Sequence, residues 1–166
     1  MIRKTFLASA ALATALAGPA HALSCMQPDP VFSFQQAEQS DDAYTVLNGT
    51  VTFNPNDMPG RDINRSPSTP DPAPVRAHFE GFYLTQDGAF TTPISRDITL
   101  QPVCFGPWCG GLSRSGEDLL AFARIEGSAI IVDLEPCNNW HFTNVRADDL
   151  ARIGACMRGE ACETRN

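Results

Sequence analysis

The sequence has 166 residues but only one lysine, Lys4, so nearly all of its positive charge comes from arginine. From Leu23 onward, ten arginines stand against nineteen aspartates and glutamates, which leaves a net charge of −9. An acidic surface argues against nucleic acid and against an anionic membrane as the main partner. The charge is typical of a protein kept soluble by its surface, and it also suits a cationic partner.

Most catalytic motifs are missing as well. The sequence contains no HExxH, no glycine-rich phosphate loop and no GxGxxG. "GLSRSG" resembles a nucleophile elbow, but Ser115 stands where the second glycine is needed. Cys104, Cys109, Cys137 and His141 could be combined into a zinc site, yet their spacing matches no common zinc pattern. The sequence therefore predicts no metal, no cofactor and no catalytic residue.

Long hydrophobic runs are absent apart from Thr5–Ala17, which is too short to span a bilayer comfortably. This run follows two basic residues and precedes the small-residue cleavage pattern Ala20–Ala22, so residues 1–22 are predicted to be an export signal. A lipid anchor at Cys25 is the alternative, but "ALSC" lacks the leucine usual three positions before the cysteine. We expect a periplasmic or secreted protein without a membrane span or lipid anchor.

Six cysteines follow this signal: Cys25, Cys104, Cys109, Cys137, Cys156 and Cys162. An even number in an exported chain predicts a disulfide framework. A thioredoxin-type site needs C-x-x-C at a helix N-terminus, whereas "CFGPWC" places four residues between its cysteines and no helical pattern follows. The Gly-Pro turn can instead bring Cys104 and Cys109 within bridging distance. A thiol-disulfide or metal-dependent enzyme using this pair remains the alternative hypothesis.

Strand patterns dominate the middle of the chain. Tyr44–Phe53 is rich in β-formers, and Gly49 within it indicates a bulge or a sharp bend. Further strand-like segments are expected at 75–85, at 89–94 as a short edge piece, at 96–105, and at 119–125 and 128–137 as a hairpin around Glu126-Gly127.

Two helices and one long loop complete the pattern. Residues 28–39 predict a short helix, and 144–159 predict a C-terminal helix that Asn144 could cap. Residues 54–74 contain six prolines and predict an exposed loop, which we expect to be disordered because only two of its residues could pack. Since helices do not alternate with strands, a mainly β, closed or half-closed small barrel over residues 23–166 fits better than a parallel sheet.

Three segments resemble one known family. "CMQPDPVFSFQQA" at 25–37, "YTVLNGTVTF" at 44–53 and the segment from "VCFGPWC" to "VDLEPC" at 103–137 resemble the netrin-like domain of tissue inhibitors of metalloproteinases. The resemblance covers about residues 23–140 and rests on the order of cysteines and strands. It implies an OB-like, five-stranded barrel with flanking helices.

One departure from the family shapes the expected disulfides. The family's inhibitors begin Cys-x-Cys, and the first cysteine chelates the zinc of the protease, whereas here Leu23 stands in that place and Cys25 in the second. The resemblance then leaves Cys104 without its usual partner. It implies that Cys109 replaces that partner, that Cys25 pairs with Cys137, and that Cys156 pairs with Cys162.

We therefore expect a non-catalytic protein-binding module, with an inhibitor-like role as the narrower form of that hypothesis. The expected binding residues are the N-terminal ridge and two aromatic residues of the Pro102–Trp108 loop: Leu23, Ser24, Cys25, Met26, Phe105 and Trp108. The alternative is that Phe105 and Trp108 only cover one end of the barrel. The sequence identifies neither the partner protein nor the oligomeric state.

Overall fold

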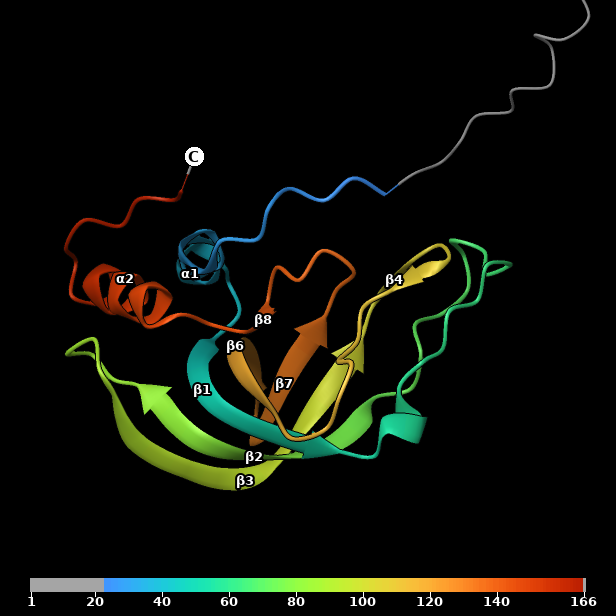
Figure 1. Ribbon diagram of the computed structural model, residues 1–166, viewed down its shortest axis with the longest axis horizontal. Helices are drawn as coiled ribbons and strands as arrows, with labels where there is room; N and C mark the ends of the chain where they lie inside the picture. The colour runs from blue at the N-terminus through green and yellow to red at the C-terminus, as the bar shows by residue number, and fades with distance from the viewer. Residues whose placement is uncertain (1–22, 166) are drawn as a thin grey trace, which may run out of the picture.

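The computed structural model describes residues 23–165, so the expected export signal at 1–22 lies outside the described residues. These described residues form two α-helices, a short 3-10 turn and eight strands (Figure 1). In chain order these are α1 (Pro30–Gln39), β1 (Tyr44–Phe53), η1 (Pro55–Asp57), β2 (Val75–Leu84), β3 (Phe90–Pro102), β4 (Cys104–Phe105), β5 (Trp108–Cys109), β6 (Glu117–Glu126), β7 (Ala129–Leu134), β8 (His141–Thr143) and α2 (Ala147–Met157).

The hydrogen-bonded order of the main sheet leads back to its first strand. β1 pairs antiparallel with β2 and β2 with β3; β3 then pairs in parallel with β7, which is antiparallel to β6. β6 in turn pairs antiparallel with β1, and the short β8 adds to β6. Figure 1 shows how strongly the long strands curve. The mainly β fold expected from the sequence is confirmed, together with both helices.

β6 shows why the sequence produces two apolar layers. Its residues 119–123 are all buried. Since alternate side chains face opposite sides of a strand, both faces of β6 must be covered. Leu119 and Ala121 join the first apolar cluster, with Val51, Phe79 and Leu100 among its members. Leu120 and Phe122 join the second cluster, which lies under the helices.

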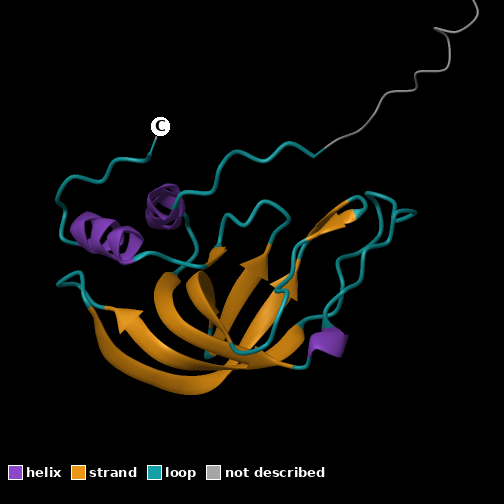
Figure 2. Ribbon diagram, viewed as in Figure 1, coloured by secondary structure: helices purple, strands orange, loops and turns teal. Residues whose placement is uncertain are grey.

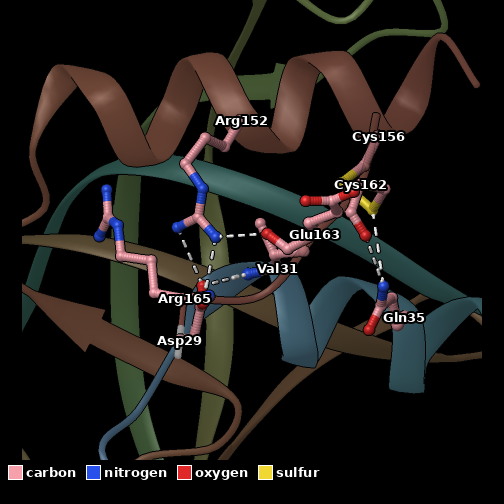
Figure 3. The surroundings of a disulfide bond; sticks show 8 residues. All are labelled: Asp29, Val31, Gln35, Arg152, Cys156, Cys162, Glu163 and Arg165. Atoms are coloured by element: carbon pink, nitrogen blue, oxygen red, sulfur yellow. Dashed lines mark hydrogen bonds and ion pairs between the residues drawn. A yellow bond between two sulfur atoms is a disulfide. The ribbon is translucent and has the colours of Figure 1, made fainter. Parts of the chain in front are cut away.

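The two helices cover one side of the sheet together (Figure 2). Val31 and Phe34 of α1 and Ile153 of α2 are buried in the second cluster. Polar contacts also link the helices. Asp29, the N-cap of α1, accepts hydrogen bonds from Arg152 of α2, and a disulfide joins Cys156 to Cys162 beside Gln35 (Figure 3).

The structure corrects two boundaries. β3 runs unbroken from Phe90 to Pro102, where the sequence predicted a separate edge piece at 89–94 and a new strand at 96–105. Pro93 is tolerated because β3 pairs with β7 only over Thr99–Pro102, so its other edge is unpaired near Pro93. The C-terminal helix is capped by Arg146 instead of Asn144, which adopts a positive φ of 58° outside the helix.

The proline-rich loop, residues 54–74, makes specific contacts with the rest of the chain instead of standing free as expected. Met58 packs against the first apolar cluster. Asp71 accepts a hydrogen bond of 2.8 Å from the backbone N–H of Cys104, and the Gln101 side chain donates to the carbonyl of Pro72 at 3.2 Å. The loop therefore lies against the end of β3 and the β4–β5 hairpin (Figure 1).

Within residues 23–165, no helix is both long enough and apolar enough to cross a membrane.

Candidate functional site

β4 and β5 form a small hairpin that projects beside the proline-rich loop. Cys104 lies directly opposite Cys109 and is bonded to it, while Phe105 lies opposite Trp108. Gly106 makes the turn with φ of 60°, a conformation that favours glycine. The structure thus closes a disulfide across the base of the hairpin and presents two aromatic side chains near its tip.

The hairpin is fixed to the sheet through its two flanking residues. The N–H of Gly110 donates to the carbonyl of Val103 at 2.9 Å, and the N–H of Val103 donates to the carbonyl of Leu134 at the end of β7, also at 2.9 Å. Together with the disulfide, these bonds limit the hairpin's freedom to move. Its aromatic residues are therefore held in place without belonging to either apolar cluster.

The N-terminal segment reaches the same region. The Cys25–Cys137 disulfide attaches it to the loop that follows β7, and Figure 1 shows the segment running past that loop toward the hairpin. The three disulfides of the structure, Cys25–Cys137, Cys104–Cys109 and Cys156–Cys162, are the three pairs that the family resemblance implied.

Two adjoining hollows flank the hairpin. The larger, about 760 Å³, is lined by Arg61, Ile63, Pro67, Cys104, Phe105, Gly106, Pro107 and Trp108. The smaller, about 400 Å³, is lined by Leu23, Pro59, Gly60, Arg61, Pro107, Trp108, Cys109 and Pro136. Arg61, Pro107 and Trp108 line both, so the hairpin, the proline-rich loop and the N-terminal segment form one continuous surface.

The structure brings together three of the six predicted binding residues. Leu23, Phe105 and Trp108 line the hollows, whereas Ser24, Cys25 and Met26 are exposed but do not. Phe105 is 46 % exposed and Trp108 is half-buried. Since neither belongs to the apolar clusters, their arrangement favours a surface over a cover for the end of the sheet.

The proline-rich loop contributes to the site, although the sequence did not indicate it. Arg61 and Ile63 line the hollows, and Ile63 is 72 % exposed, the second most exposed large apolar side chain among residues 23–165. The one sign in the sequence that this loop could bind a ligand was the presence of an isoleucine and an arginine in a proline-rich segment. The contacts that bring them to the hairpin could not be deduced from composition.

The geometry of Cys104 and Cys109 differs from that of a thioredoxin-type site. Both lie in paired two-residue strands, so no helix N-terminus is present at either sulfur to stabilise a thiolate. All cysteines of the described chain are in disulfides, and no group of three or more His, Cys, Asp or Glu residues there is arranged to hold a metal.

A separate, polar cluster that the sequence did not indicate lies across β2 and β3. His78 has Asp97 Oδ1 2.9 Å from Nδ1 and Ser95 Oγ 3.2 Å from Nε2, the order of contacts found in a serine hydrolase triad. In such a triad the aspartate is buried, whereas the Asp97 side chain is 92 % exposed and that of His78 42 %. Water then screens the carboxylate, and we assign the cluster no catalytic role.

The surface formed by the hairpin, the proline-rich loop and the N-terminal segment is therefore the strongest candidate site. Two disulfides hold its hairpin and its N-terminal segment, and its apolar side chains line the two hollows. The sequence matches no protein-family model, and comparisons with curated proteins and with solved structures found no match.

Proposed function

We propose that this chain is an exported, non-catalytic module that binds another protein through the hairpin surface, defined here as Leu23, Arg61, Ile63, Phe105 and Trp108. One observation carries the proposal: exposed apolar side chains from three distant segments gather around a disulfide-closed hairpin. Exposed apolar patches mark interaction sites more often than they arise by chance. Aromatic residues held in one conformation are typical anchors, because ordering them on binding costs little entropy.

The proposal includes an OB-like five-stranded barrel related to the netrin-like domain. The cycle of pairings β1–β2–β3–β7–β6–β1 supports it, since closing a sheet on itself requires such a cycle. The two flanking helices and the three disulfides agree with what the resemblance implied. Hairpins joined to a barrel are also suitable places for binding residues, because the barrel holds their bases rigidly.

Export is part of the same proposal. Three disulfides are expected in a periplasmic or extracellular protein, because cytosolic reductants keep thiols reduced. The proposal does not extend to inhibition of a zinc protease. Leu23 stands where the family has its chelating cysteine, so the N-terminal ridge Leu23–Met26 is tethered only through Cys25. Ordering the residues before Cys25 on binding would therefore cost conformational entropy.

Photo-crosslinking tests the proposal with a matched control in the same chain. Phe105 and Phe82 are 46 % and 44 % exposed, but only Phe105 lies on the hairpin surface. With p-benzoyl-phenylalanine in place of Phe105, we expect crosslinks to one discrete partner in the native host. The same group in place of Phe82 should give none. Absence of a partner at 105, or equal products at both positions, contradicts the proposal.

The melting temperature of Trp108→Ala separates binding from a structural role. If Trp108 serves binding, its removal should lower the melting temperature by only a few degrees, since it lies outside both apolar clusters. Removing a tryptophan from a core costs about 3–5 kcal/mol, which would lower the melting temperature by roughly ten degrees. A fall of that size with all disulfides intact would make the hairpin a structural element.

A further inference from the structure

The hairpin surface contains one charged residue, and its position suggests what the partner presents. Arg61 lines both hollows, and among residues 23–165 it is the only charged residue that lines either of them. The other lining residues are proline, glycine, disulfide cysteine, aliphatic or aromatic. A ligand that fills both hollows therefore meets a single positive charge between apolar walls.

Arg61 is free to bind a ligand. Among residues 23–165, its side chain makes no hydrogen bond or ion pair, whereas Arg124, Arg152 and Arg165 all pair with carboxylates. Of the acids in the same loop, Asp62 accepts from the backbone of Asn64 and Asp71 from that of Cys104, and neither pairs with Arg61. Arg61 is also exposed, so a ligand can reach its guanidinium.

We propose that the hairpin surface binds an extended peptide segment of its partner in which apolar side chains flank one carboxylate, with Arg61 receiving that carboxylate. The inference rests on the proposed function and names the chemistry of its ligand. A guanidinium donates two parallel hydrogen bonds to a carboxylate, and the apolar walls strengthen this pair by excluding water. The carboxylate is an Asp or Glu side chain or a free chain end.

The charges of the chain favour a carboxylate over a phosphate. Residues 23–166 carry a net charge of −9, so the overall field opposes a dianion more than a monoanion. A single guanidinium balances one carboxylate, while phosphate recognition usually gathers several cationic groups. The remainder of the partner is expected to be neutral or cationic for the same reason.

The shape of the surface favours an extended segment. The hollows adjoin along Pro107 and Trp108, and Arg61 lines both beside them. One apolar side chain can enter each hollow while the carboxylate between them meets Arg61. Proline-rich and aromatic walls of this kind suit peptides that are already extended, since these lose little conformational entropy on binding.

Selection from phage-displayed random peptides tests this inference. The wild-type chain, with its disulfides intact, is the target for one library with internal peptides and one with free carboxyl ends, which distinguishes the two sources of the carboxylate. We expect selected peptides to combine apolar residues with an acid or a chain end. Arg61→Gln should weaken their binding by about ten-fold or more. Arg114→Gln is the control, because Arg114 lines a separate hollow.

A double-mutant cycle identifies the contact itself. Replacing the peptide's Asp by Asn, or amidating its chain end, should weaken binding to the wild type but cause no further loss in Arg61→Gln. Peptides without acid enrichment that bind Arg61→Gln equally well would overturn the inference yet leave the proposed function intact. Failure of Phe105→Ser and Trp108→Ala to weaken any selected peptide would overturn the proposed function.

A second copy of the chain is the remaining possible occupant of the hairpin surface. Sedimentation equilibrium of the wild-type chain should show a monomer at micromolar concentration. A dimer that Phe105→Ser dissociates would show that a second copy covers the hairpin surface, and that result would overturn the inference.

Discussion

Arg152 of α2 donates two hydrogen bonds to the carboxylate of Asp29, of 3.1 and 3.0 Å, across the interface between the two helices (Figure 3). Asp29 also accepts from the backbone of Val31 and of Arg165, so one carboxylate joins α1, α2 and the C-terminal segment. Its side chain is only 10 % exposed and that of Arg152 20 %. Burial raises the pKa of Asp29, but the hydrogen bonds from Arg152, Arg165 and Val31 together lower it below 3.8.

Arg152→Met should therefore destabilise the fold. It retains much of the side chain's volume but leaves a largely buried carboxylate with fewer donors, and this costs on the order of 2 kcal/mol. The melting temperature should fall by about 2–4 °C per kcal/mol for a chain of this size. Glu160→Gln, which breaks the exposed Arg158–Glu160 pair, is the control and should change little. Equal melting temperatures for the two variants would show that the Asp29 contact contributes nothing.

Gly49 and Gly81 face each other where β1 and β2 bend. A Cβ on Gly49 would lie 2.2 Å from the carbonyl oxygen of Glu80 and 2.5 Å from the Cα of Gly81, so the two backbones leave no room for a side chain. Gly49→Ala should separate the strands and cost about 1–3 kcal/mol, or more if the sheet cannot adjust. In Gly60→Ala nothing lies within 4 Å of the new Cβ, and we expect wild-type stability. Chemical denaturation of both variants provides the comparison.

The local patterns predicted the strands well where they are long and alternate. Tyr44–Phe53 has the expected bounds, and Val75–Leu84 ends one residue earlier than expected, because β-branched and aromatic residues recur along both. Gly49 indicated a bend or a bulge. The unshifted β1–β2 register favours the bend, which arises from the close approach of two glycines that lie 32 positions apart. A pairing partner so distant cannot be deduced from one strand.

The candidate site was predicted only in part, for a similar reason. Phe105 and Trp108 could be found because a cysteine pair brackets them, and their disulfide is a local contact. Arg61 and Ile63 reach the hairpin only because distant groups hold the loop, such as the bond from Cys104 to Asp71. β8, three residues long, carries no periodic signal and depends on its pairing with β6.

The three disulfides should contribute unequally to stability. In the chain-entropy model, a loop of about 100 residues gives about 4–5 kcal/mol and a loop of about five residues roughly 2. The Cys25–Cys137 bridge spans 112 positions and Cys104–Cys109 only five. We therefore expect the Cys25→Ser/Cys137→Ser variant to lose about twice as much unfolding free energy as Cys104→Ser/Cys109→Ser. Urea denaturation of the two double variants measures the difference.

The short bridge should matter more for binding than for folding. Without this disulfide, the hairpin would retain the hydrogen bonds of Val103 and Gly110. Phe105 and Trp108, which lie beyond these bonds, would no longer be held in one conformation. The crosslinking yield from position 105 should then fall while the sheet stays folded. A Cys104→Ser/Cys109→Ser variant that crosslinks as efficiently as the wild type would show that rigidity of the hairpin is not required.

His141 makes stability depend on pH between about 6.5 and 4. Its side chain is buried, and this burial lowers its pKa from 6.5 to about 4, although a hydrogen bond with the backbone of Asp133 opposes the shift. The unfolded chain binds a proton at His141 near pH 6.5, whereas the folded chain binds it only near pH 4. The stabilisation is therefore fully present above pH 6.5 and is lost as the pH falls toward 4.

The expected loss between pH 7.5 and 4.5 is about 2–3 kcal/mol, since one pKa unit corresponds to about 1.4 kcal/mol. His141→Gln should flatten the melting temperature over this range relative to the wild-type chain. Because His141→Gln could disturb packing, the imidazole signal of His141 in the wild-type chain gives an independent measurement by NMR. Titration of that signal near pH 6.5 would show that the folded protein takes up the proton without cost, and the predicted pH dependence would then be wrong.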